Sequence, residues 1–76
     1  MEKREYIRNR RLLSAKLIEA RESTGLTQKQ VAETGIITQS ELSKLENSSR
    51  RVDFLCLLEL AELYKQPITY FVPEKK

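Results

Sequence analysis

The residues of this chain that can do chemistry are amides, hydroxyls and cations rather than nucleophiles or metal ligands. The chain has a single cysteine, Cys56, and no histidine. Cys56 therefore has no partner for an internal disulfide, no cysteine or histidine cluster for zinc, and no neighbouring base to activate its thiol. We expect no enzymatic activity, no metal site and no cofactor.

Polar side chains gather instead between residues 27 and 47. Thr27 with Gln30, and Thr38 with Glu41, have the spacing of a capping box, so a helix is predicted to start after each threonine. The second of these helices is predicted to present four side chains outward: Gln39, Ser40, Ser43 and Lys44. Glutamine can bond bidentately to adenine, lysine can donate to guanine, and hydroxyls suit base edges or phosphates. The same face is also typical of an ordinary solvated helix.

Five short helices are needed to position these side chains, and the apolar spacing and cap residues predict them at 10–23, 28–34, 39–47, 54–64 and after Pro67. The first can begin earlier. With 39% apolar and 33% charged residues, two glycines and two prolines, the composition favours an all-α, compact five-helix domain. The predicted core contains Leu13, Leu17, Ala20, Val31, Ala32, Ile37, Leu42 and Leu45.

Three parts of the chain are distinguished by their composition. Residues 1–9 are a basic N-terminal arm or a helix extension, residues 10–72 are the domain, and residues 73–76 are a tail. The formal net charge is +3, with the basic excess in the first two thirds. Lys3, Arg4, Arg8, Arg10 and Arg11 either follow a phosphate backbone or form a solubilising terminus. No run approaches the ~20 apolar residues of a membrane span, so we expect a cytoplasmic protein without a membrane partner.

From about Leu12 to Phe71 the sequence resembles the DNA-binding domain of lambdoid phage repressors and Cro, the group often called XRE-type regulators. Several groups of residues carry the resemblance: Leu26-Thr27-Gln28 with Val31-Ala32, then Gln39, Leu42, Ser43, Leu45 and Glu46, then Arg50-Arg51-Val52-Asp53, and finally Leu57, Leu58 and Ala61. The resemblance implies a lambda-repressor-like fold whose helix-turn-helix unit binds double-stranded DNA through its third helix.

The resemblance also implies roles for individual residues. DNA contacts would be made by Thr27, Gln28, Thr38, Gln39, Ser40, Ser43, Lys44, Arg50 and Arg51. Gln28 would bond a phosphate and brace Gln39, while Arg50 and Arg51 would contact the backbone. Arg21 and Glu46 match a buried structural salt bridge.

Two positions depart from the family pattern. The family's turn glycine falls one residue after Gly35, so either the turn has shifted or Ile36 is left-handed. Ser48 stands where many members have glycine.

The fourth helix has more apolar residues than one stripe requires. With Phe54, Leu57, Leu58 and Ala61 facing inward, Cys56, Leu60 and Leu63 form a second stripe that Tyr70 and Phe71 extend. This stripe predicts a homodimer, which would act as a repressor on a palindromic operator. Two alternatives remain open: the last helix covers both stripes in a monomer, or the apolar face binds another protein.

Overall fold

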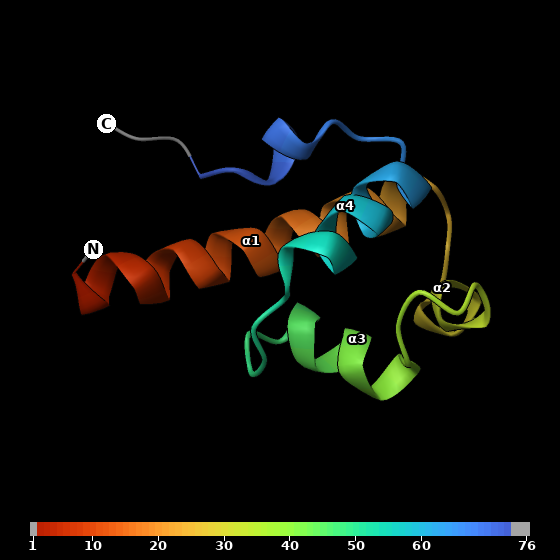
Figure 1. The fold of residues 1–76 in the computed structure, drawn as a ribbon, viewed down its shortest axis with the longest axis horizontal. Coiled ribbons are helices and arrows are strands. Elements are labelled where there is room, and N and C mark those ends of the chain that lie inside the picture. The colour runs from red at the N-terminus through yellow and green to blue at the C-terminus, as the bar shows by residue number, and fades with distance from the viewer. Residues whose placement is uncertain (1, 74–76) are drawn as a thin grey trace.

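The structure, a computed structural model, describes residues 2–73, and the regular elements among these residues are all helices (Figure 1). Its elements are α1 (Lys3–Ser23), α2 (Gln28–Glu33), α3 (Gln39–Glu46), α4 (Phe54–Leu63) and the 3-10 segment η1 (Ile68–Phe71). The all-α prediction is confirmed, but the expected fifth α-helix is wrong. Only four residues follow Pro67 in that segment, and the Tyr70 and Val72 amides bond three residues back, at 2.9 and 3.2 Å, which closes 3-10 turns.

The first helix begins at Lys3, seven residues before the predicted start at Arg10. No glycine or proline interrupts the segment, so the helix continues through the basic residues, and the described part of 1–9 is a helix extension. Its 21 residues rise about 31 Å at 1.5 Å each, which accounts for most of the 36 Å long axis of the molecule. Met1 and residues 74–76, most of the predicted tail, lie outside the described residues.

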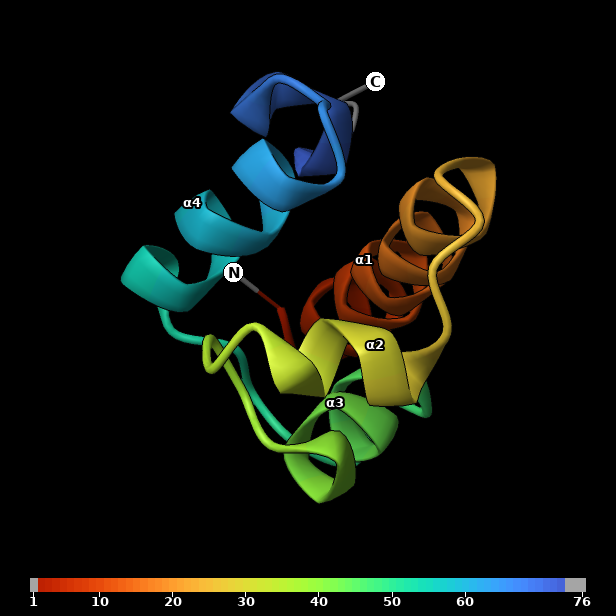
Figure 2. The ribbon, with the colours of Figure 1, turned by 90° about the vertical axis from the view of Figure 1, so that its right-hand side faces the viewer.

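The remaining elements pack around the second half of α1. In Figures 1 and 2, α2 and α3 cross each other on the lower side of the molecule, while α4 and η1 lie above them. The apolar core between these groups consists of Leu17, Ala20, Val31, Ile37, Leu42, Leu45, Leu60, Ala61, Tyr64 and Phe71. Six of the eight predicted core residues are in this set; Leu13 and Ala32 are half-buried. One side of α3 therefore anchors the core and its other side forms the lower surface.

The residue that follows each C-cap has a left-handed backbone, which ends the helix sharply. Gly25 and Gly35 take this position after α1 and α2 with φ of 75° and 84°, and Ser48 and Lys65 take it after α3 and α4 with φ of 65° and 59°. Since Gly35 has the positive φ and Ile36 does not, the turn between α2 and α3 has shifted by one residue rather than straining Ile36. Ser48 has the same left-handed conformation, which glycine adopts without steric cost and which is therefore the reason many family members have glycine here.

The rotation of α4 about its axis differs from the prediction. Leu60 is 0% exposed and Phe71 3%, so both belong to the core rather than to an external stripe. Phe54 and Leu55, in contrast, are 64% and 71% exposed. Phe54 and Leu58 were predicted to face inward, and both predictions are wrong because these side chains are exposed. The two polar residues of the helix, Glu59 and Glu62, are exposed and lie on the same side as Leu55 and Leu58, so they mark the observed rotation, whereas the predicted inward set followed apolar spacing alone.

This assignment predicts different effects for two leucines of the same helix. Leu60→Ala should lower the free energy of unfolding by ~2–5 kcal/mol, because it leaves a cavity in the core. Leu55→Ala should change the unfolding free energy of the monomer by less than about 0.5 kcal/mol, since its side chain is exposed there. Urea denaturation at low micromolar concentration measures both. Equal losses for the two variants would show that the rotation of α4 is wrong.

Candidate functional site

The helices α2 and α3 both begin with a complete capping box, as the sequence predicts. The Thr27 hydroxyl accepts from the Gln30 amide at 3.1 Å, and the Gln30 side chain accepts from the Thr27 amide at 2.9 Å. Thr38 and Glu41 repeat this exchange at 3.1 and 3.2 Å. Each box satisfies backbone donors that a short helix cannot bond internally. The boxes fix where each helix starts and hence which residues face outward.

The outward face of α3 consists of uncharged polar groups and one cation. Gln39, Ser40 and Lys44 are exposed and Ser43 is half-buried. Their side chains make no hydrogen bond or ion pair to any other part of residues 2–73. Leu42 and Leu45, on the opposite side, are 0% and 3% exposed. The predicted face therefore exists as a set of free donors and acceptors on a helix anchored by its apolar side.

The acidic residue near this face, Glu41, is bonded to other groups of the protein. Its carboxylate accepts from the amide and hydroxyl of Thr38 and pairs with Arg50 at 3.1 Å. The bond from the Thr38 amide, followed by that from its hydroxyl, holds the pKa of Glu41 below its usual value, and Arg50 acts in the same direction. Glu41 therefore stays ionised beside the outward residues of α3, with its charge paired to Arg50.

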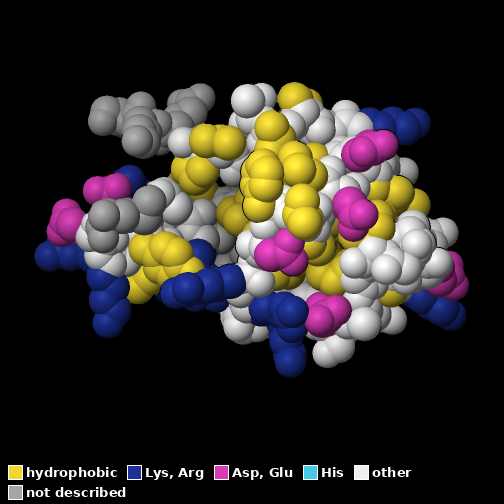
Figure 3. All heavy atoms as spheres, viewed as in Figure 1, with side chains coloured by type: hydrophobic (Ala, Val, Ile, Leu, Met, Phe, Trp, Pro, Cys, Tyr) yellow, Lys and Arg dark blue, Asp and Glu magenta, His cyan; other side chains and the backbone are white. Residues whose placement is uncertain are grey.

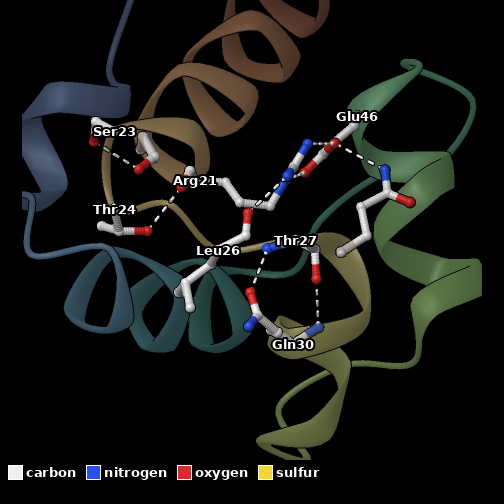
Figure 4. A network of polar contacts seen from close by, with 9 residues as sticks. Arg21, Ser23, Thr24, Leu26, Thr27, Gln30 and Glu46 are labelled. Atoms are coloured by element: carbon white, nitrogen blue, oxygen red, sulfur yellow. Dashed lines mark hydrogen bonds and ion pairs between the residues drawn. The ribbon is translucent and has the colours of Figure 1, made fainter.

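The last residue of α3, Glu46, forms the predicted ion pair with Arg21 of α1 (Figure 4). Arg21 Nε and Nη2 donate to the two carboxylate oxygens at 2.7 and 3.0 Å. Nη1 of the same guanidinium donates to the Leu26 carbonyl at 2.8 Å, just before α2. The bond to Glu46 raises the pKa of Arg21, and burial followed by the Glu46 charge raises that of nearby Tyr64 to about 12. One guanidinium thus ties α1 to the start of α2 and the end of α3.

The predicted contact between Gln28 and Gln39 is wrong. Gln28 Nε2 donates to Glu46 Oε1 at 2.9 Å, so the Gln28 side chain braces the ion pair and not Gln39. The buried carboxylate attracts the amide more strongly than a neutral side chain on the exposed face would. Gln28 is half-buried, and the second hydrogen of its Nε2 makes no hydrogen bond within residues 2–73.

The two predicted backbone-contact arginines are exposed, whereas the five predicted interface residues are not. Arg50 and Arg51 are exposed, Arg50 against Glu41 and Arg51 with its guanidinium 5.1 Å from the centroid of the Tyr6 ring. Of the five predicted interface residues, Leu60 and Phe71 are core, whereas Cys56, Leu63 and Tyr70 are half-buried. Burial raises the pKa of the Cys56 thiol, which opposes a reactive thiolate.

Sequence reasoning missed the polar groups that join α1 to the end of α3. The Ser14 hydroxyl is buried and donates to the Leu45 carbonyl at 2.6 Å, and the Ser48 hydroxyl donates to Ser14 Oγ at 2.8 Å. Arg10 donates to the Ser48 carbonyl. The only signal in the sequence is that Ser14 lies among the inward positions of α1, where a polar residue requires a partner.

No group of three or more potential metal ligands occurs within residues 2–73, and no helix in that part of the chain is long and apolar enough to cross a membrane.

Two short helices that cross at a tight turn, with the second exposed along one side, define a helix-turn-helix unit. The family model for the helix-turn-helix domain matches residues 15–74 of this chain. The chain therefore belongs to the helix-turn-helix domain family.

Two solved structures are similar to this one. The crystal structure of the DNA-binding domain of BldD is 28% identical in sequence, with a TM-score of 0.79, and the match covers 88% of this chain and 97% of that one. The S. venezulae BldD DNA-binding domain is also 28% identical, with a TM-score of 0.77 and coverage of 87% and 99%. A search of curated proteins found no match.

The burial of the Arg21–Glu46 pair predicts strong coupling between its partners. Arg21→Ala and Glu46→Ala should each cost ~3–5 kcal/mol of unfolding free energy, because each leaves an uncompensated buried charge. The double variant Arg21→Ala/Glu46→Ala should cost clearly less than the sum. Lys16→Ala, which removes the exposed 3.7 Å pair with Glu19 and the contact of the Lys16 ammonium with the Tyr70 ring, should cost only ~1–2 kcal/mol. Additive losses in chemical denaturation would contradict the buried coupling.

Proposed function

We propose that this protein is a sequence-specific regulator of transcription that binds double-stranded DNA with α3 in the major groove and represses by occupying its operator. The observation that carries this proposal is the free amide, hydroxyl and ammonium groups along the exposed side of α3. The similarity to two DNA-binding domains of BldD supports it. The lambdoid type of operator recognition is part of the same proposal.

The chemistry of the α3 face suits base edges in the major groove. The Gln39 amide can donate to and accept from adenine, and the Lys44 ammonium can donate to the guanine acceptors. Ser40 and Ser43 have short hydroxyls that reach bases or adjacent phosphates. Because Leu42 and Leu45 anchor the opposite side of the helix, the polar side chains are presented on a rigid support.

Contacts to the phosphate backbone are assigned to residues around this helix. Arg50 and Arg51 follow α3, and a guanidinium has donors left for a phosphate even when one side is paired, as Arg50 is with Glu41. Thr27, Gln28 and Thr38 stand at the starts of α2 and α3, where their side chains already bond within the protein. They would therefore contribute with their remaining hydrogen-bonding capacity. Such contacts position the domain without reading sequence.

We further propose a homodimer through the exposed apolar residues of α4, Phe54, Leu55 and Leu58, in place of the stripe expected from the sequence. Figure 3 shows hydrophobic side chains gathered over α4 in the centre of that face. Phe54 and Leu55 directly follow the loop that leaves α3, so a dimer through them would join two recognition helices in one assembly. Two modules about 34 Å apart can read successive major grooves of a palindrome, whereas one reads too few base pairs.

A second candidate function uses the same apolar residues. A helix-turn-helix domain that bound another protein through Phe54, Leu55 and Leu58 would also leave them exposed in the free chain. The α3 face favours the DNA proposal, because a protein-binding module has no need of free base-reading groups there.

Selection of binding sites from a random duplex pool tests the DNA proposal. The wild-type chain should enrich a palindrome, and Gln39→Ala should lose ~1–3 kcal/mol of discrimination at one position in each half-site. Glu62→Ala, an exposed change on α4, should leave the selected sequence unchanged. Absence of any enriched sequence at moderate salt would exclude a sequence-specific regulator and favour the protein-binding alternative.

The dimer predicts a specific effect of a charge on α4. Leu55→Glu should shift the protein from dimer to monomer in sedimentation at tens of micromolar, because two desolvated carboxylates would face each other across the axis. Val72→Glu places the same charge on another exposed apolar residue and should leave the dimer intact. A wild-type monomer under these conditions would overturn the dimer.

A further inference from the structure

Tyr6, in the helix extension of α1, has two guanidinium groups on its ring. The central carbon of Arg10 lies 5.8 Å from the ring centroid, and that of Arg51 lies 5.1 Å from it. Arg10 comes from the next turn of the same helix, whereas Arg51 comes from the loop between α3 and α4. The electron-rich ring attracts both cations and so holds together two like charges that would repel each other in its absence.

A hydrogen bond to the loop after α3 also holds the Arg10 side chain in place. Arg10 donates to the Ser48 carbonyl, and the Ser48 hydroxyl bonds Ser14, which in turn bonds the Leu45 carbonyl in the last turn of α3. Ser48 is left-handed with a φ of 65°, so the loop turns sharply at this contact. The first half of α1 therefore holds the loop that carries Arg50 and Arg51 in a set position relative to α3.

Positive charge exceeds negative charge at this junction, where three arginines lie near a single paired carboxylate. Arg50 pairs with Glu41 at 3.1 Å, but neither Arg10 nor Arg51 has an ion pair among residues 2–73. Tyr6 and all three arginines line a cavity of about 280 Å³ whose remaining walls are largely apolar. Guanidinium donors that line one cavity match the oxygens of a phosphate group.

The surroundings favour a phosphate of the DNA backbone over a free phosphorylated molecule. Lys and Arg side chains follow the lower side of the molecule from the N-terminal part of α1 toward the centre in Figure 3, the side on which α3 lies in Figure 1. Arg51 is five residues beyond the end of α3. A duplex read by α3 would continue past this loop toward the helix extension.

We propose that Tyr6, Arg10 and Arg51 form a clamp for one backbone phosphate just outside the half-site read by α3, in which the Tyr6 ring positions the two guanidiniums. The clamp rests on the proposed function of α3. It extends each half-site beyond the helix-turn-helix unit and gives the helix extension a role in affinity without a role in base recognition.

The salt dependence of binding to the selected operator tests the clamp. Each phosphate contact contributes about 0.9 to the slope of log K against log salt, so a variant that loses the clamp in both half-sites of the dimer should lower the slope by about 1.8. Tyr6→Leu removes the ring but keeps an apolar side chain, and Arg51→Gln removes one guanidinium; both should show this loss. Tyr6→Phe keeps the ring face and should retain the wild-type slope. Lys65→Gln removes one charge beyond the far end of α4 and should leave the slope unchanged.

Operators with an uncharged methylphosphonate at single flanking positions locate the phosphate. At one position per half-site, the wild type should lose as much affinity as Tyr6→Leu loses on unmodified DNA, and Tyr6→Leu should lose nothing more. If an operator is selected but Tyr6→Leu and Arg51→Gln keep the wild-type slope, the clamp is wrong and the DNA proposal stands. If wild type and variants are equally insensitive to every flanking methylphosphonate, the clamp is also wrong. Failure to select any operator overturns both proposals.

Discussion

The ion pair between Arg21 and Glu46 determines where α3 lies, and the exposed face of the domain depends on α3. Taking both charges out of water is costly, and the pair is stable only when its remaining hydrogen bonds are satisfied. Glu46 meets this requirement with two donors from Arg21 and one from Gln28, and Arg21 uses its remaining nitrogen on the Leu26 carbonyl. A single cluster therefore joins α1, α2 and α3.

The short helices of the functional unit depend on such contacts. At six and eight residues, α2 and α3 are shorter than the ~12–15 residues that an isolated helix needs to be marginally stable in water. Capping boxes satisfy their first amides, and left-handed residues at Gly35 and Ser48 end them. Val31 and Leu42, both 0% exposed, then fix each helix to the core. Local signals set the length of each helix, whereas tertiary contacts make it stable.

The same division between local and tertiary information decides what the sequence could predict. Helix starts at Thr27, Thr38 and Asp53 were predictable, because a cap is written in neighbouring residues. The rotation of α4 has a weaker signal, since only Glu59 and Glu62 mark its exposed side and the apolar residues Phe54, Leu55 and Leu58 are exposed as well. The contact of Tyr6 with Arg51 joins residues 45 positions apart and leaves no local pattern. The Arg21–Glu46 pair also joins residues far apart in the sequence, and it was predictable only from the resemblance to lambdoid repressors.

Residue type alone does not assign a polar side chain to the outer surface of a helix-turn-helix unit. Gln28 and Gln39 are chemically identical and both stand at the first position of a short helix. Gln28 is bonded to the buried Glu46 carboxylate, and Gln39 has no partner within the described residues. Glu41, on α3 itself, is likewise bonded to Thr38 and Arg50. What distinguishes the groups available for another molecule is that the fold leaves their hydrogen bonds unmade while it anchors their backbone.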